Sequence, residues 1–210
     1  MKRFLSFACL CLLAAGCATT NPVPPPPDPE TQMPALASRI AALVEEERQK
    51  LDPGVKALVL DPELTKIAQA RARDMAAKNY LAHVAPNGDT SASLLMADDD
   101  KWQGLLGENL AAQHYLKLSG VDVETFAQRF LDEWMKSDPH RENLAYPAYD
   151  RTGVGAAVSG DTVYVAELFA SDLGLKPQSD SKNGNPGPAE AETDIAGTAP
   201  PLRGSGAGQP

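Results

Sequence analysis

Cysteine is missing from almost the whole chain. The three cysteines, Cys9, Cys11 and Cys17, all lie within the first 17 of 210 residues. The rest can form neither a disulfide nor a thiolate metal site, so its stability must come from an ordinary packed core. Basic residues are also few, since 19 Lys and Arg stand against 28 Asp and Glu, for a formal net charge of −9. This balance argues against nucleic acid as a partner and predicts no attraction to anionic lipid headgroups.

Long apolar runs are missing too, and the one at the start is too short to span a bilayer. Lys2 and Arg3 precede an apolar run over residues 4–15, which ends in the sequence Leu-Ala-Ala-Gly-Cys at residues 13–17. This arrangement resembles the lipobox of bacterial lipoproteins, whose cysteine is acylated and becomes the first residue after cleavage. We therefore expect residues 1–16 to be a signal peptide and Cys17 to be the lipidation site. The alternative is a secretory signal with an incidental cysteine.

The resemblance to lipoproteins also implies a location. Acyl chains would hold the protein to a membrane without a spanning helix. Ala18 follows the cysteine, where an aspartate would suggest retention at the inner membrane. We therefore expect the protein in the bacterial cell envelope, anchored to the outer membrane and facing the periplasm.

Composition divides the remainder into three parts. Residues 17–34 hold the predicted lipidated cysteine and many prolines, which favour an extended spacer. Residues 35–175 are long enough for one folded domain. Residues 176–210 are rich in Gly, Pro, Ser, Ala and Asn with few large apolar residues, which predicts a disordered tail.

The periodicity within residues 35–175 changes along the chain. Apolar residues recur at helical spacing over 36–51, 64–76 and 126–134, and Asp61-Pro62 and Asp122 are helix-start signals. From Val154 onward, apolar residues alternate in two runs separated by a Ser-Gly-Asp turn. Helices first and strands last predict an α+β domain, with helices packed on a small antiparallel sheet.

Four short motifs occur in a fixed order. They are Tyr-Leu-Ala-His at 80–83, Gly-Glu-Asn-Leu-Ala at 107–111, a Trp-to-Leu segment at 134–144, and Gly-Val-Gly at 153–155. In order and spacing they resemble the bacterial branch of the CAP superfamily, which includes the cysteine-rich secretory proteins, antigen 5 and pathogenesis-related protein 1. The resemblance covers roughly residues 39–169. It implies a CAP (SCP) domain with an α-β-α sandwich and an open cleft.

The resemblance also implies a candidate site. In many family members two histidines and two glutamates line the cleft and bind zinc or another divalent ion. By position in the motifs, His83, Glu108 and His140 match three of them, while the fourth position is Ser137 instead of glutamate. Glu133 lies four residues earlier, on the same helix face as Ser137, and is a possible substitute ligand. Two imidazoles and one carboxylate suit Zn²⁺ with an open position for water.

The residues leave alternatives open. His83, Glu108 and His140 could instead form a buried polar network, and Glu133 could be an ordinary surface residue. The alternation of the last strand allows Glu167 to be either a polar cleft group or an exposed edge residue.

Three functions compete. The first is a non-enzymatic binding or interaction module of the envelope, whose cleft holds a divalent metal, an apolar ligand or a cell-wall ligand. The second is a metal-assisted, protease-like hydrolase with His83, Glu108 and His140 as catalytic candidates. The third is a structural envelope protein. We favour the binding module, with the hydrolase as the alternative.

Overall fold

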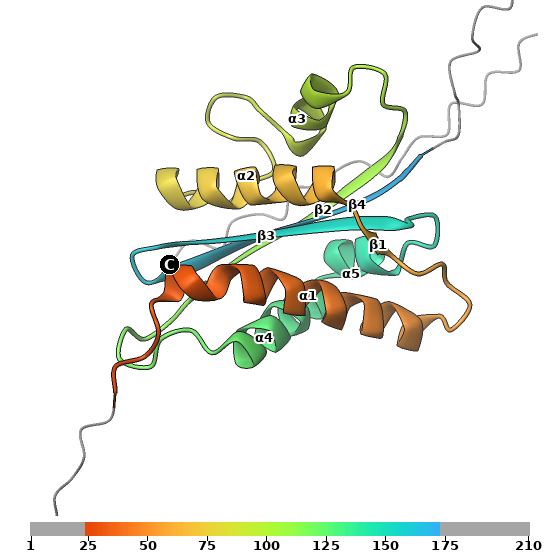
Figure 1. Cartoon of the computed structure of the whole chain (residues 1–210). Coiled ribbons are helices and arrows are strands. Elements are labelled where there is room, and N and C mark those ends of the chain that lie inside the picture. Colours follow the sequence, from red (N-terminus) through yellow and green to blue (C-terminus); the bar gives the residue numbers. More distant parts are fainter. Residues whose placement is uncertain (1–23, 173–210) are drawn as a thin grey trace, which may run out of the picture.

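The computed structural model describes residues 24–172. The predicted signal peptide, the lipidation site Cys17 and the predicted disordered tail all lie outside these residues. Within them, no helix has the length and apolar character needed to cross a membrane. Figure 1 shows the arrangement as three layers, with one sheet between two groups of helices.

Five helices cover the two faces of the sheet (Figure 1). One large apolar cluster joins one face to three of these helices, and a second joins the opposite face to the other two. The first group consists of α1 (Pro29–Leu51), α4 (Val123–Lys136) and α5 (Asp138–Ala145). The second group consists of α2 (Pro62–Lys78) and α3 (Ser91–Asp98).

The sheet has four strands in the order β1-β3-β4-β2. Its members are β1 (Val59–Leu60), β2 (Gly104–His114), β3 (Arg151–Ser159) and β4 (Thr162–Asp172). β3 pairs antiparallel with β4, and β4 antiparallel with β2, while the two-residue β1 pairs parallel with β3. The prediction of an α+β sandwich is confirmed. The sheet is mixed and not purely antiparallel, however, because β1, which follows α1 in the chain, pairs parallel with β3.

The predicted helix starts are present. The Asp61 carboxylate accepts hydrogen bonds from the backbone N–H groups of Glu63 and Leu64 at the start of α2. Asp122 caps α4 in the same way through the N–H of Thr125. These caps satisfy donors that the first helical turn leaves without partners.

The first helix starts earlier than the sequence predicted. We expected the Pro-rich spacer to extend to residue 34, but α1 begins at Pro29 behind the N-cap Asp28. Proline is well tolerated in a first turn because its missing N–H would have no partner there. Met33 is already buried at 5% exposure, so the packed domain includes residues that we had assigned to the spacer.

The segment 107–111, for which the sequence predicted no strand, is part of strand β2. Gly, Asn and Glu have low strand propensity, but this strand is buried along residues 107–111 and its polar groups find partners in the fold. Strands are therefore interleaved with helices, and the prediction of helices first and strands last is wrong for β1 and β2.

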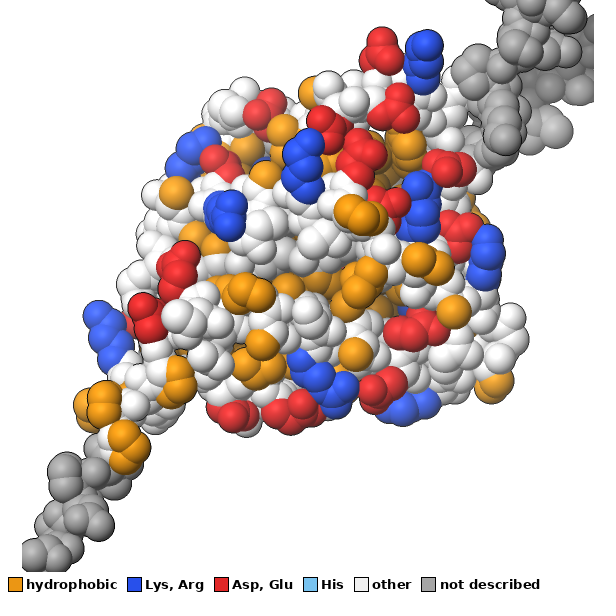
Figure 2. Space-filling view, in the orientation of Figure 1, with side chains coloured by type: hydrophobic (Ala, Val, Ile, Leu, Met, Phe, Trp, Pro, Cys, Tyr) orange, Lys and Arg blue, Asp and Glu red, His pale blue; other side chains and the backbone are white. Residues whose placement is uncertain are grey.

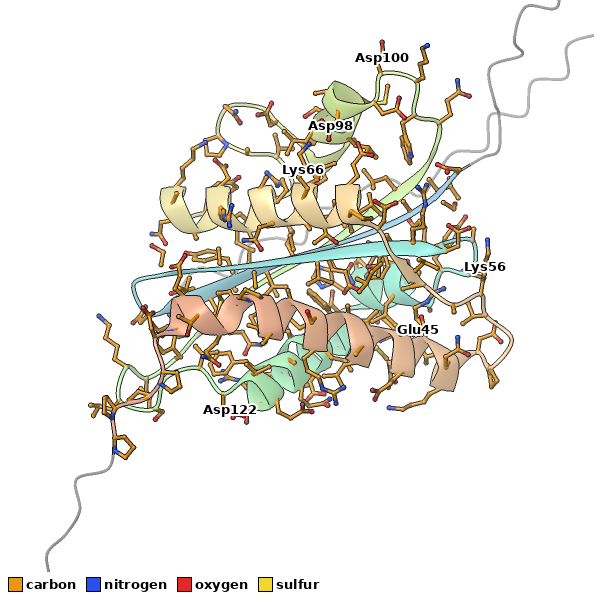
Figure 3. All side chains as sticks on the ribbon, in the orientation of Figure 1. Glu45, Lys56, Lys66, Asp98, Asp100 and Asp122 are labelled. Atoms are coloured by element: carbon orange, nitrogen blue, oxygen red, sulfur yellow. The ribbon has the colours of Figure 1, made fainter. Side chains whose placement is uncertain are left out.

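Helix α2 is held in its layer by close packing on glycines of β3 and by an ion pair to α3. A Cβ at Gly153 or Gly155 would lie 2.2 Å from a backbone nitrogen of α2, so only glycine permits this approach. On its outer side, Lys66 of α2 and Asp98 of α3 form an ion pair at 2.5 Å (Figure 3). The position of α3 matters because its first residue belongs to the candidate site.

Candidate functional site

The candidate site lies at strand β2, which is an edge strand of the sheet. Successive residues of a strand point to opposite faces. Leu106 and Leu110 pack in the cluster on the α2 side, and Glu108 between them shares that face. Ala111 packs in the other cluster, and Asn109 shares its face. The edge strand thus offers polar groups to both helical layers.

The Glu108 carboxylate is enclosed by three partners. Its side chain is 5% exposed and lies 3.4 Å, Oε1 to Nε, from Arg71, which is 1% exposed. The Ser91 hydroxyl donates a hydrogen bond to the same oxygen, Oε1. Nδ1 of His83 lies 2.6 Å from the other oxygen, Oε2. Since a carboxylate accepts only, Nδ1 of His83 is the donor in this bond.

Arg71 also orders the segment that carries His83. Its guanidinium donates to the carbonyls of Ala82, at 2.7 Å, and His83, at 3.0 Å. It donates as well to the Tyr80 hydroxyl, at 3.1 Å, which in turn donates to Asp74 at 2.6 Å. Burial and the Asp74 hydrogen bond raise the pKa of Tyr80 to about 12. One arginine therefore fixes both the histidine segment and the carboxylate that it faces.

His140 approaches from the opposite helical layer. Burial, and next the charge of the nearby His83, lower the pKa of its imidazole. Its Nδ1 is buried without a hydrogen-bond partner. Its backbone carbonyl accepts from the Asn109 side chain at 3.0 Å, and Asn143 donates to the Glu108 carbonyl at 3.1 Å. Helix α5 is thus attached to the sheet beside the candidate site.

The space beside these groups is small. A pocket of about 60 Å³ is lined by residues that include His83, Ser91, Leu106 and Glu108. A site needs roughly 10 to 15 Å³ of such volume to hold one water. The pocket can hold a few waters or one small polar group, and it cannot enclose a lipid chain.

The two possible fourth ligands are not part of this cluster. Glu133 is exposed on α4, where its carboxylate accepts from Gln113 at 2.8 Å. It lines a separate surface hollow of about 520 Å³ with His114, Arg129 and other residues. Ser137 stands at the junction of α4 and α5 and makes no side-chain capping bond.

The donor groups do not fit a zinc site that includes Glu108. Both of its carboxylate oxygens are engaged, one of them by a cation that would repel a metal ion. Within residues 24–172, no group of three or more His, Cys, Asp or Glu side chains is arranged to hold a metal.

Glu167 is neither a cleft group nor an edge residue. It lies in the interior strand β4 and is fully buried. Thr152 donates to its Oε1 at 3.2 Å, while Oε2 has no partner. Burial raises the pKa of Glu167 to about 8, against smaller opposite effects from Thr152 and the charge of Arg48.

Two residues of the cluster were missed from the sequence, Arg71 and Ser91. A signal for Arg71 was present, because it falls on the apolar face of α2 with Leu64, Ile67 and Met75. An arginine on an apolar face predicts a buried acceptor. For Ser91, nothing in the local sequence indicates a glutamate partner.

Comparisons with known proteins give consistent matches. The model of the family "CAP: Cysteine-rich secretory protein family" matches residues 42–171. The uncharacterized protein YkwD of Bacillus subtilis is 29% identical over 126 residues, which cover 60% of this chain and 44% of the relative. The chain therefore spans less than half the length of this curated relative.

Solved structures show the same fold. An extracellular SCP-domain protein from Bacillus anthracis has 26% identity and a TM-score of 0.53, covering 70% of this chain and 44% of that one. An outer surface protein from Borrelia burgdorferi has 21% identity and a TM-score of 0.54, covering 66% of this chain and 93% of that one.

Proposed function

The chain belongs to the CAP family of cysteine-rich secretory proteins, and we propose that it is a non-enzymatic interaction module of the bacterial cell envelope. It is tethered to the outer membrane through lipid on Cys17 and faces the periplasm. The observation that carries the proposal is the enclosure of Glu108 by Arg71, Ser91 and His83. A carboxylate bonded on both oxygens stabilises the fold and is not free to bind a metal or to move a proton.

A larger surface hollow is the better ligand site. It lies between α4 and the end of β2, and its lining groups carry charges of both signs. This chemistry suits a cell-wall peptide with free amino and carboxylate groups better than an apolar ligand. The lining residues are Gln113, His114, Arg129, Asp132, Glu133 and Lys136.

Calorimetric titration of the chain with a soluble cell-wall peptide tests the ligand. We expect saturable binding that weakens at least tenfold in an Arg129→Ala/Lys136→Ala variant. The matched control is Arg73→Ala/Lys78→Ala, which removes two basic residues from α2 in the opposite layer and should leave binding unchanged. Absent binding, or equal loss in both variants, contradicts the proposed ligand.

Zinc titration tests the role of the polar cluster. The enclosed Glu108 predicts that the chain binds no zinc at micromolar concentration, and that a His83→Ala/His140→Ala variant titrates in the same way. Micromolar binding that disappears in the variant would instead establish a metal site between the two histidines.

Tethering has its own test. In bacteria the chain should incorporate labelled fatty acid and sediment with membranes, and Cys17→Ser should abolish both. A Cys11→Ser variant is the control, since Cys11 lies within the predicted signal peptide. A Cys17→Ser chain that still incorporates the label would contradict lipidation at this cysteine.

The alternative, a hydrolase, is favoured by one observation. His83 lines the small pocket, and Glu108 orients its ring through Nδ1, so Nε2 is the nitrogen that a hydrolase would use as proton acceptor. The hydrolase hypothesis predicts that the chain cleaves a fluorescent casein, and that this activity is lost in His83→Ala and kept in His114→Ala. Activity that survives in His83→Ala would belong to a contaminant.

A further inference from the structure

The two most exposed large apolar side chains among residues 24–172 lie in one short loop. Leu116 is 76% exposed and Leu118 is 94% exposed, with Lys117 between them. Single exposed apolar residues are common on protein surfaces. Two on one loop, at the same end of the domain, require an explanation.

This loop is held in shape by hydrogen bonds. The Leu116 carbonyl accepts from the N–H groups of Ser119, at 2.8 Å, and Gly120, at 3.0 Å. Gly120 has a φ of 67°, a backbone conformation in which glycine is favoured. Before the loop, the Tyr115 hydroxyl donates to the Gly160 carbonyl at 3.1 Å. The leucines are therefore presented to solvent by an ordered turn.

The loop lies where the described chain enters the domain. A Cβ at Gly120 would lie 2.6 Å from Cβ of Pro26, so the turn packs directly on the segment that leads into α1 (Figure 1). Pro24 and Pro25 of that segment are exposed as well. Figure 2 shows hydrophobic side chains gathered at the end of the molecule where the described residues begin.

The position of this end relative to a membrane follows from chain length. Pro24 lies seven positions after Cys17, and a fully extended chain over seven positions reaches about 25 Å at most. A compact domain of this size is roughly 40 Å across, as its radius of gyration indicates. If Cys17 is acylated, the tether keeps the loop near the bilayer at high effective concentration.

We propose that Leu116 and Leu118 insert into the lipid bilayer and fix the domain with this end on the membrane. The inference rests on the proposed lipid tether. Leucine side chains suit the boundary between headgroups and acyl chains, and Lys117 can extend its ammonium toward the headgroups. The charge of the chain is acidic overall, so contact depends on the leucines and not on anionic lipid.

This orientation has a consequence for the rest of the molecule. The β1 strand and the C-terminal end of α1 lie at the other end of the domain (Figure 1). They would point away from the bilayer toward the periplasmic space. The charged hollow beside His114 would lie near the membrane, because His114 is only two residues before Leu116.

Fluorescence on the full-length acylated protein tests the contact. In a Leu118→Cys variant the only other cysteine after signal removal is Cys17, so an environment-sensitive dye labels one position. The protein is reconstituted on phosphatidylcholine vesicles that contain spin-labelled lipid. We expect the dye at position 118 to be quenched at least threefold. Val59→Cys, at a 65% exposed position in β1, is the control and should remain unquenched.

Flotation of the same samples distinguishes a failure of the loop contact from a failure of the proposed lipid tether. The protein could float with the vesicles while the dye is quenched no more at position 118 than at position 59. That result would contradict the loop contact and leave the proposed tether intact. Protein that does not float overturns the tether and the loop contact together. Since Leu118 is 94% exposed, its substitution should not affect folding, and circular dichroism of the variant verifies this.

Discussion

Arg71 and Glu108 form a buried ion pair that joins helix α2 to the edge strand of the sheet. Their side chains are 1% and 5% exposed, and Nε and Oε1 lie 3.4 Å apart. The two residues are 37 positions apart in the sequence, so only the fold brings them together. The pair is surrounded by Ser91 and His83, which complete the hydrogen bonds of the carboxylate.

Removal of one partner should be costly. Glu108→Ala leaves the Arg71 guanidinium buried without its carboxylate, and we expect a loss of about 3 to 5 kcal/mol in the free energy of unfolding. Urea denaturation measures this loss. The control Glu133→Ala removes an exposed carboxylate and should change stability by no more than about 0.5 kcal/mol. Similar values for both variants would contradict the structural role of the pair.

Glu167 should make stability depend on pH. Its pKa is raised from 4.5 to about 8 in the folded chain, so between these values the folded state keeps a proton that the unfolded state has lost. Stability is then fully present below about pH 4.5 and falls as pH rises to about 8, by a few kcal/mol in order of magnitude. Glu167→Gln should flatten this profile in urea denaturation at pH 5, 6, 7 and 8. A profile that keeps its slope in the variant would assign the effect to another group.

Gly155 should not tolerate a side chain. A Cβ there would lie 2.2 Å from the backbone nitrogen of Gln69, so Gly155→Ala must push α2 away from β3. We expect a loss of about 3 kcal/mol or more, at the upper end of overpacking effects. Gly54→Ala is the matched control, because the nearest atom to a Cβ at Gly54 is 3.4 Å away. Equal melting temperatures for the two variants would contradict the close packing.

Arg48 should be irreplaceable by lysine. Its guanidinium is fully buried and donates to four backbone carbonyls, those of Lys56, Leu144, Tyr146 and Tyr149. A lysine has three donors on one nitrogen and cannot reach acceptors placed around a planar fork. We expect Arg48→Lys to lose about 2 to 3 kcal/mol, since it leaves buried carbonyls without donors. Lys50→Arg, an exposed exchange on the same helix, should be neutral in the same thermal unfolding assay.

The helix-start signals and the apolar helix faces could be predicted because they depend on residues close together in the sequence. Asp61 and Asp122 cap helices through N–H groups two or three residues away, and the apolar face of α2 is buried as its period predicts. Strand β2 was missed because its propensities are poor and its burial comes from distant elements. β1 was missed because two residues carry no periodic pattern.

The candidate site was predicted in part. His83 and Glu108 do meet, and His140 lies near enough for the charge of His83 to lower its pKa. Glu133 and Ser137 do not join the cluster. A shared helix face in the sequence does not determine on which side of the sheet that helix packs. Arg71 was overlooked, although its place on an apolar face was visible.

The sequence by itself determined the family, the α+β class and the identity of three polar residues of the candidate site, His83, Glu108 and His140. Motifs and apolar periodicity depend only on the order of residues in the chain. Tertiary structure alone decided what those residues do. A carboxylate in the sequence is equally a metal ligand, a proton acceptor or an ion-pair partner. Its role depends on which groups reach its oxygens, and at Glu108 those groups come from α2, α3 and the segment after α2.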